Sequence, residues 1–392
     1  MTAAAAKSPN YFMYFPDNYR WSAEMLAILG TAPYGGAEIA EVDRIGRQLK
    51  ACVGDDTAWF NAWTAGGDLL LSRAQNAESK SHPLTAAANY LRACSQYQHA
   101  EHFRQPKDDA AVAVFRRSLD CFRKYMALID RPRIEAVEIP YENGALPAYF
   151  IHAENTQLAR PPCVVRFGGF DTQKELQYLR GVADLVRRGF SCLLVDGPGM
   201  GESIRFRGFQ LRHDYEVVGS ACLDYLATRS DVALDRVGVV ALSLGGYFAP
   251  RCAALDARFK ACVAWGAMWD FHRMWQTRIE RIESQKNVSM PAPAEHFLWV
   301  FGEKTYAAAL RRTEGFVLDG VVQNMRCPFL LTHGTDDEQV PLADAQKLFD
   351  AVGSSDKTFR IFTPEEGGAQ HCQRDYLTRV CDTIADWLEE KL

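Results

Sequence analysis

The 392-residue sequence has neither an excess of basic residues nor a long apolar run. Forty-four lysines and arginines stand against 49 aspartates and glutamates, which gives a formal net charge of −5. A global basic field for nucleic acid or anionic lipid is therefore excluded. No apolar run approaches the ~20 residues of a membrane helix, and residues 1–9 are not typical of a secretory signal. We expect a cytoplasmic protein that binds neither nucleic acid nor membrane.

The sequence also lacks the spacings of metal and nucleotide sites. Its eleven cysteines form no C-x-x-C pair, and several, such as Cys163, stand in apolar runs where a reduced thiol packs like a small hydrophobe. His99 and His102 have no neighbouring pattern that completes a metal site. The glycines in 168–169 and 197–201 do not form a phosphate-binding motif. We therefore predict no metal and no cofactor.

Two halves of the sequence differ in periodicity. Residues 1–130 carry helical spacing and almost no strand signal, with helices expected over 55–71, 86–103 and 110–128. From residue 131 onward, β-rich segments alternate with helical ones, and the expected strands are 134–140, 146–151, 163–167, 191–195, 237–241, 261–265, 329–332 and 358–362. One helix is expected over 174–188, and 196–201 is expected to be a tight turn. This alternation predicts an α/β domain with a mostly parallel sheet and helices on both faces.

The segment 266–320 is a long interval between two of these strands. We interpret it as mostly helical and partly a lid inserted in a catalytic domain, 131–392. Its aromatic and methionine side chains, together with those of the N-terminal half, predict a pocket for a flat, apolar or aromatic small molecule.

Ser243 ends a β-branched strand and is followed by a glycine-bearing helix start. In a nucleophile elbow the serine sits on a strained strand-to-helix turn whose neighbours two positions away must be small. Gly245 meets that need, and Ala241 stands where a first glycine is usual. The alternative is a serine that only caps the helix.

Two later motifs supply the partners of a serine nucleophile. The strand 329–332 runs into an H-G-x-x-D-x-x-V-P segment with Asp337 at the acid position, and Asp336 is the alternative if the register differs by one residue. Asp337 could instead be a turn residue or helix cap. His371 follows in a glycine-bearing loop before the last helix. The chain order Ser, Asp, His is that of an α/β hydrolase triad.

An oxyanion hole needs two backbone N–H donors aimed at the developing charge. Leu244, directly after the serine, is the first candidate. The second is Gly169 or Phe170, in the loop after the strand 163–167, where glycines permit close approach.

The sequence resembles the α/β-hydrolase superfamily, in particular the branch that includes 2,6-dihydroxypseudooxynicotine hydrolase, FrsA-like hydrolases and fungal polyketide-shortening pigment hydrolases. The segments that carry the resemblance are 19–22, 59–63, 90–93, 167–175, 196–199 and 369–372. It covers nearly the whole chain. It implies an N-terminal all-helical lid or cap domain over 1–130, a triad of Ser243, Asp337 and His371, and a homodimer.

The resemblance implies a serine hydrolase that cleaves a C–C bond in a β-diketone-like aromatic or polyketide-derived substrate. The alternative is a carboxylesterase, thioesterase or acyltransferase acting on an apolar acyl substrate, and the remote one is a non-catalytic binding protein. One relative in this branch has an extra acidic residue after the strand that follows the nucleophile helix. Asp270 is the only carboxylate there, but an N-cap is an equal interpretation. Trp269 and His272 beside it are candidates for substrate contact.

Overall fold

The computed structural model describes residues 12–284 and 293–392. Two segments discussed above lie outside the described residues: 1–9, which was judged not to be typical of a secretory signal, and 285–292, which is part of the expected lid. Over the described ranges, no helix combines the length and the apolar character that crossing a membrane requires. All eleven cysteines are free thiols.

The first part of the chain is helical. Its helices are α1 (Tyr19–Gly30), α2 (Ile39–Leu49), α3 (Asp56–Ser79), α4 (Pro83–His102) and α5 (Asp109–Leu128), with single 3-10 turns at Ala32–Tyr34 and Lys50–Cys52. The side chain of Asp55 accepts hydrogen bonds from the first turn of α3, and Asp108 does the same for α5. These caps satisfy N–H groups that have no partner within the helix, which is why both helices begin where they do.

Helices α3 and α4 pack at very short distance. A Cβ added at Gly67 of α3 would lie 2.5 Å from the ring of Tyr97 on α4, and one at Gly66 would lie 2.2 Å from Oε1 of Gln96. A larger residue at Gly66 would displace the end of the Gln96 side chain, and one at Gly67 would displace the Tyr97 ring. The Tyr97 hydroxyl also donates to Asp68 of α3 over 2.6 Å.

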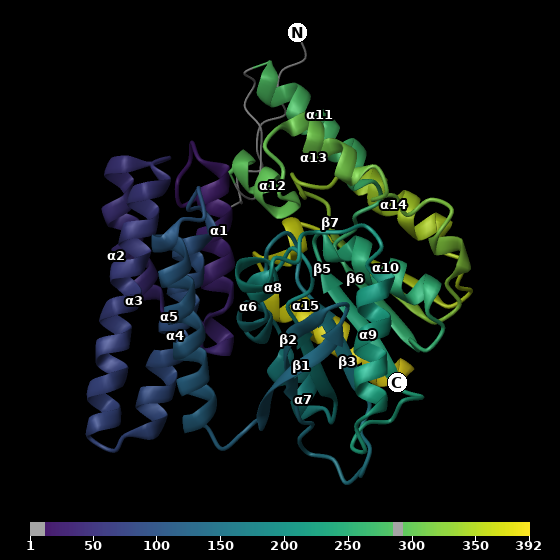
Figure 1. The fold of residues 1–392 in the computed structure, drawn as a ribbon, viewed down its shortest axis with the longest axis horizontal. Coiled ribbons are helices and arrows are strands. Elements are labelled where there is room, and N and C mark those ends of the chain that lie inside the picture. Colours follow the sequence, from purple (N-terminus) through teal and green to yellow (C-terminus); the bar gives the residue numbers. More distant parts are fainter. Residues whose placement is uncertain (1–11, 285–292) are drawn as a thin grey trace.

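An eight-stranded sheet forms the rest of the fold (Figure 1). Its strands are β1 (Ile134–Tyr141), β2 (Gly144–Ile151), β3 (Cys163–Phe167), β4 (Ser191–Val195), β5 (Val237–Leu242), β6 (Ala261–Trp265), β7 (Phe329–Gly334) and β8 (Lys357–Phe362). The spatial order is β1-β2-β4-β3-β5-β6-β7-β8. The pairs β1–β2 and β2–β4 are antiparallel and all the others are parallel, so the predicted mostly parallel sheet is confirmed.

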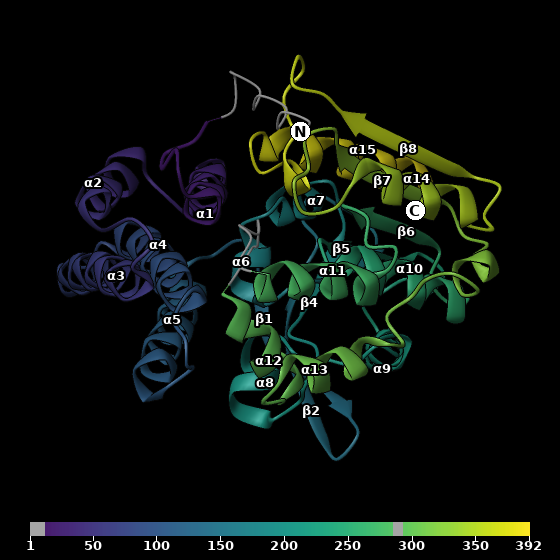
Figure 2. The same cartoon turned by 90° about the horizontal axis from the view of Figure 1, so that it is seen from above.

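Helices cover both faces of the sheet. They are α6 (Lys174–Tyr178), α7 (Val182–Arg187), α8 (Gly201–Arg207), α9 (Glu216–Ala227), α10 (Gly245–Leu255), α14 (Leu342–Ala351) and α15 (Leu377–Lys391), with 3-10 turns at Val322–Asn324 and His371–Gln373. Figure 2 shows α7 and α15 on one side and α9 and α10 on the other. Successive strand residues alternate between the two cores: Cys192 and Leu194 pack with α7 and α15, whereas Leu193 and Val195 pack with α9 and α10.

One local expectation was wrong. The segment 174–188 is two helices: α6 ends at Tyr178, and Gly181, with a left-handed φ of +75°, directly precedes α7. Residues 201–207, which follow the expected turn, form α8. The Asp196 carboxylate accepts from the backbone N–H of Glu202 over 2.9 Å at the start of that helix. A side chain six positions upstream therefore stabilises a helix start that the local sequence did not indicate.

The interval between β6 and β7 holds α11 (Phe271–Glu283), α12 (Ala294–Phe301) and α13 (Tyr306–Thr313). These helices lie over the ends of β5 and β7 (Figure 1), so the predicted helical content of this segment is confirmed for its described residues. Much of its aromatic content is core: Trp275 and Phe297 stack with ring centroids 4.0 Å apart and are 1% and 0% exposed.

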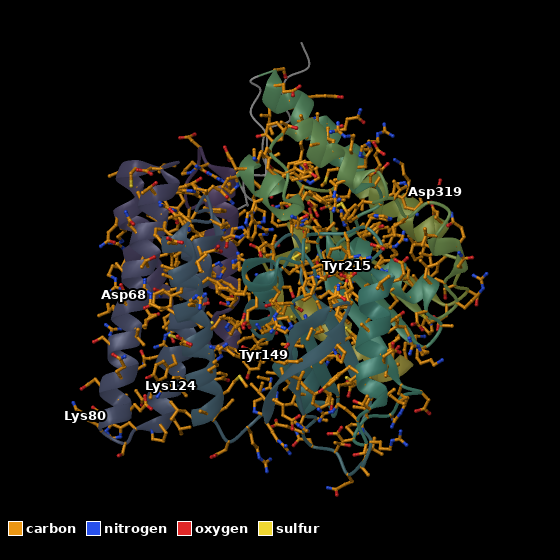
Figure 3. The ribbon with its side chains drawn as sticks, in the orientation of Figure 1. Asp68, Lys80, Lys124, Tyr149, Tyr215 and Asp319 are labelled. Atoms are coloured by element: carbon orange, nitrogen blue, oxygen red, sulfur yellow. The ribbon has the colours of Figure 1, made fainter. Side chains whose placement is uncertain are left out.

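The helical region packs against the sheet through α5. Figure 3 labels Tyr149, which lies where β2 meets these helices. Its ring stacks on Phe122 of α5 at a centroid distance of 4.9 Å, and its hydroxyl donates to the Glu175 carboxylate over 2.8 Å. Gln98 of α4 donates to the same carboxylate over 2.9 Å. This buried junction holds the helices at a fixed place beside the sheet.

Candidate active site

Ser243 lies between β5 and α10 on a strained turn. Its φ is +60°, which is costly for a residue with a side chain. Its N–H donates to the carbonyl of Trp265 over 2.9 Å. A Cβ at Gly245 would lie 2.6 Å from Cβ of Ala241, so one methyl group at 241 is accommodated because position 245 has none. The turn presents the Ser243 hydroxyl beyond the end of the sheet.

His371 and Asp337 meet this hydroxyl from two other loops. The Ser243 Oγ is 2.8 Å from Nε2 of His371, and Nδ1 of His371 is 2.7 Å from Oδ2 of Asp337. The other carboxylate oxygen, Oδ1 of Asp337, accepts from the backbone N–H groups of Gln339 and Val340 over 2.8 and 2.9 Å. Asp336 instead bonds the neighbouring hydroxyl of Thr335. The structure thus brings Asp337, and not Asp336, to the imidazole.

Burial and charge shift the acidity of this pair in opposite directions. Burial alone would raise the pKa of Asp337, but the His371 imidazole and its hydrogen bond lower that pKa to about 2. Burial alone would lower the pKa of His371, but the Asp337 carboxylate, aided by Cys372, raises it to about 9. The Sγ of Cys372 is 3.5 Å from Nε2 of His371. The arrangement stabilises an imidazolium next to the serine hydroxyl.

The loop after β3 approaches the serine closely. A Cβ at Gly169 would lie 2.8 Å from Cβ of Ser243, so only glycine fits there. The next two residues are Phe170 and Asp171, and the N–H of Asp171 already donates to Sδ of Met200 over 3.2 Å. Leu244 is buried at the start of α10. The backbone of Gly169 therefore lies against the Ser243 side chain, and Leu244 follows the serine directly at the start of α10.

Asp171 anchors this loop through a buried ion network. It has a left-handed φ of +58° and is 0% exposed. Arg205 of α8 donates to both of its carboxylate oxygens, over 2.9 and 2.6 Å, and to Glu101 of α4 over 3.1 and 2.7 Å. Lys107 lies 3.0 Å from Glu101. Burial alone would raise the pKa of Asp171, but Arg205 holds it well below its usual range. The helical region and the Gly169–Phe170 loop are thus joined by charge.

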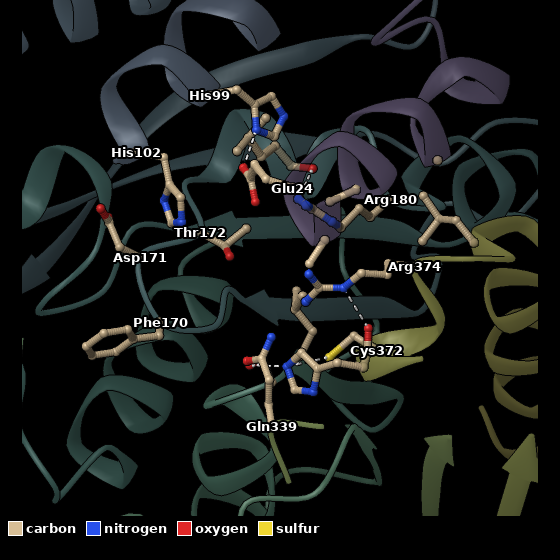
Figure 4. Close-up of a pocket in the computed structure, with 18 of the residues that line it drawn as sticks. Glu24, His99, His102, Phe170, Asp171, Thr172, Arg180, Gln339, Cys372 and Arg374 are labelled. Carbon is tan, nitrogen blue, oxygen red and sulfur yellow. Dashed lines mark hydrogen bonds and ion pairs between the residues drawn. The ribbon is translucent and has the colours of Figure 1, made fainter. Parts of the chain in front are cut away.

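Two pockets open at Ser243. The first, here called the polar pocket, is lined by side chains of the helical region and of the loops around His371 (Figure 4). Its polar members are Arg20, Glu24, His99, His102, Asp171, Thr172, Arg180, Gln339, His371 and Arg374. The second, here called the apolar pocket, is smaller and is lined by Phe170, Leu244, Met268, Phe271, Met274, Trp275, Arg278, Gln339 and Val340. Ser243 lines both.

The remaining predicted residues lie elsewhere. Asp270 is the N-cap of α11, and its carboxylate accepts from the N–H of Arg273 over 2.8 Å. Trp269 and Asp270 line a separate cavity against α14. His272 contacts the Thr313 hydroxyl over 2.7 Å through Nδ1. None of the three lines the polar or the apolar pocket; the structure does not bring them to Ser243.

The polar pocket contains residues that the sequence did not indicate. Glu24 of α1 is 2.6 Å from Nδ1 of His99 on α4, and Arg180 and Arg374 flank the same space (Figure 4). Burial alone would raise the pKa of Glu24, but the neighbouring histidines and Arg374 lower it to about 2. His99 and His102, considered above only as a possible metal pair, belong to this pocket. No motif links these positions, so only their placement by the fold reveals them.

No group of three or more metal-ligating side chains comes together among residues 12–284 and 293–392. The chemistry that the described residues offer around Ser243 is a hydroxyl, an imidazole, carboxylates, guanidinium groups and backbone N–H groups. These suit acyl transfer by nucleophilic attack.

Comparison with known proteins places this geometry in context. Residues 178–392 match the prolyl oligopeptidase family. Hydrolase LUC6 of Fusarium sp is 32% identical, with 96% of this chain and 97% of LUC6 aligned. The 20-hydroxy-prefusarin hydrolase FUS2 of Gibberella moniliformis is 29% identical, with 93% and 95% aligned. Among solved structures, 2,6-dihydroxy-pseudo-oxynicotine hydrolase superimposes with a TM-score of 0.76 at 23% identity, over 93% of this chain and 95% of that one. The shared fold therefore includes the N-terminal helices.

Proposed function

Because the chain belongs to the prolyl oligopeptidase family of α/β hydrolases, we propose that this hydrolase uses Ser243, His371 and Asp337 as a catalytic triad. The observation that carries the proposal is the continuous path from the Ser243 hydroxyl to the buried Asp337 carboxylate, over 2.8 and 2.7 Å. Those are the contacts that a nucleophile, its general base and the orienting acid require.

In the proposed mechanism, Nε2 of His371 takes the proton of Ser243 as Oγ attacks a substrate carbonyl. Asp337 orients the imidazole and stabilises its charged form. The N–H groups of Leu244 and of Gly169 or Phe170 stabilise the oxyanion, and each such donor contributes about 3 to 4 kcal/mol. His371 then protonates the leaving group. Water, activated by the same imidazole, cleaves the acyl-enzyme and releases an acid.

We propose a β-diketone-like substrate, aromatic or polyketide-derived, in which the bond that breaks is a C–C bond. The electron pair of that bond stays with the leaving carbon and is delocalised onto the second carbonyl as an enolate. His371 delivers its proton to that carbon. The basic side chains of the polar pocket favour such an anion. A carboxylesterase would follow the same steps with an alkoxide as the leaving group, and the apolar pocket would suit its acyl chain.

We also propose that residues 1–130 act as a cap domain on the catalytic domain 131–392, and that the protein is a cytoplasmic homodimer. The support for the cap is that α1 and α4 supply Glu24, His99 and His102 to the polar pocket. Light scattering of the purified protein measures the oligomeric state, and a monomer at all concentrations would refute the dimer.

The test of the reaction uses wild-type protein, Ser243→Ala and the exposed control Ser79→Ala. Each is incubated with an aryl β-diketone and with an aryl ester of similar shape, and products are measured by mass spectrometry. Cleavage of the diketone by the wild type and the control, but not by Ser243→Ala, is expected. Cleavage of the ester alone would favour the carboxylesterase. Equal rates for wild type and Ser243→Ala would refute the triad.

A further inference from the structure

The two pockets at Ser243 differ in chemistry and share few residues. Phe170, Ser243 and Gln339 line both, so the serine stands at their boundary. On one side, Phe271, Met274 and Trp275 offer apolar surface, and the one charged group there is Arg278, which donates to the Gln339 carbonyl over 3.3 Å. On the other side the walls are mainly charged. A substrate whose reacting carbonyl sits on Ser243 therefore places its two halves in different surroundings.

The polar pocket carries a net positive charge around the space beside Ser243. The guanidinium of Arg20 is paired with Asp56 over 2.8 Å and that of Arg205 with Asp171 over 2.6 Å, so these charges are balanced. Arg180 then faces the same space as Glu24, whose carboxylate already contacts Nδ1 of His99 over 2.6 Å (Figure 4). Such a pocket attracts an anionic group.

Arg180 has donors left for a ligand. Its guanidinium donates one N–H to the carbonyl of Leu176 in α6, over 3.0 Å, and a guanidinium has five N–H groups. Arg180 lies in the short turn between α6 and α7, directly before Gly181, and lines the pocket. A planar fork of this kind suits a carboxylate, an enolate or a phenolate oxygen.

The position of His371 decides which half of the substrate enters which pocket. His371 lines the polar pocket and does not line the apolar pocket, whereas Leu244, the candidate oxyanion donor, lines the apolar pocket. The protonated imidazole must reach the atom that leaves. The leaving group therefore occupies the polar side, and the acyl group that stays on Ser243 occupies the apolar side.

We propose that the substrate joins an apolar acyl group to a leaving group bearing an acidic oxygen, and that Arg180 determines this specificity. The inference rests on the proposed function. When the acyl–leaving-group bond breaks, its electron pair stays with the leaving group, and the proton that His371 took from Ser243 passes to the leaving atom. Arg180 and Arg374 bind the anionic oxygen of that group throughout. Water then releases the apolar acid from Ser243.

The first test measures binding, so it does not depend on turnover. Calorimetry compares 3-hydroxybenzoate with the uncharged 3-hydroxybenzamide on wild type, Arg180→Gln, Arg180→Lys and Arg187→Gln, an exposed arginine of α7 that serves as a control. The carboxylate is expected to bind wild type about tenfold more tightly than the amide, the difference of one charge-assisted hydrogen bond. Arg180→Gln is expected to abolish that preference; the two other variants retain it. Equal binding of both compounds to wild type would overturn the proposal.

The second test uses two isomeric esters that differ only in which half carries the charge: 3-carboxyphenyl 3-phenylpropanoate and phenyl 3-(3-carboxyphenyl)propanoate. The wild type is expected to prefer the first by about tenfold in kcat/KM. Arg180→Gln should lose this preference through KM, whereas the exposed control Arg187→Gln should keep it. The opposite preference would overturn the assignment and leave the triad standing. Hydrolysis that survives in Ser243→Ala would instead refute the proposed function.

Discussion

The sheet region and the helical region supply the surroundings of Ser243 in different ways. Ser243, Asp337 and His371 each follow a strand or precede a helix of the sheet region, and short loops set their positions. Glu24 and His99 of the helical region lie within long helices, 75 residues apart in the sequence. Helix packing alone brings those two together. The comparison teaches that short loops of the sheet region place the groups next to Ser243, whereas helix packing places Glu24 and His99 in the wall of the polar pocket.

The largest expected effect concerns the sheet region alone. Asp337→Asn should lower kcat by about 10⁴-fold, because an amide neither stabilises the imidazolium nor fixes the tautomer of His371. Asp336→Asn is the matched control, since Asp336 does not contact the imidazole. Steady-state kinetics on an activated aryl ester measures both variants. Equal losses of kcat in the two variants would mean that Asp337 is not the only carboxylate on which His371 depends.

The next effect tests the junction between the two regions. Arg205→Met should lower the free energy of unfolding by about 3 to 5 kcal/mol, because it leaves Asp171 and Glu101 as buried carboxylates without their main partner. Arg207→Met, on the same helix but paired with the exposed Glu138, should cost less than about 1 kcal/mol. Urea denaturation followed by circular dichroism gives both values. Similar losses of unfolding free energy in Arg205→Met and Arg207→Met would show that the buried ion pairs of Arg205 do not stabilise the junction.

A smaller effect appears in the pH dependence of wild type. His371 acts as a base only when neutral, and its pKa is raised to about 9 by Asp337 and Cys372 against the lowering effect of burial. Below that pKa, kcat/KM should rise about tenfold for each pH unit and then level off. A stopped assay between pH 6 and 10 measures the profile. A plateau that begins below pH 7 would contradict the expected shift.

Cys372→Ala tests one cause of the expected pKa shift of His371. Because Cys372 is among the groups that raise the pKa of His371, its removal should move the rising limb toward lower pH. Cys381→Ala, at another buried cysteine of the sheet region, is the control and should leave the profile in place. The comparison is made with the same stopped assay.

Much of the sheet region could be predicted because its signals are local. The strand before Ser243, the loop with Asp337 and the loop with His371 each carry a recognisable run of neighbouring residues. The break between α6 and α7 was missed because the residues on both sides of Gly181 have helical spacing. α8 was missed because Asp196, outside the helix, stabilises its start.

The polar pocket could not be predicted for a different reason. The residues around Glu24 come from α4, which carries His99 and His102, and from the loop that carries Arg374. No single stretch of the sequence therefore contains this group of residues. The aromatic residues of the lid were expected to line the substrate site. Several instead pack on one another in the core, as Phe297 and Phe301 do, since burial removes more apolar surface from water than a pocket wall does.

The close packing of α3 and α4 has a consequence for how the pocket tolerates mutation. Gly66 and Gly67 contact Gln96 and Tyr97, and two residues further along the same helix stands His99, which lines the polar pocket. A methyl group at Gly67 would force the Tyr97 ring to move, because close-packed side chains leave no free volume for it. The position of α4, and with it the place of His99 in the wall of the polar pocket, therefore depends on a glycine of α3 that lies outside that pocket.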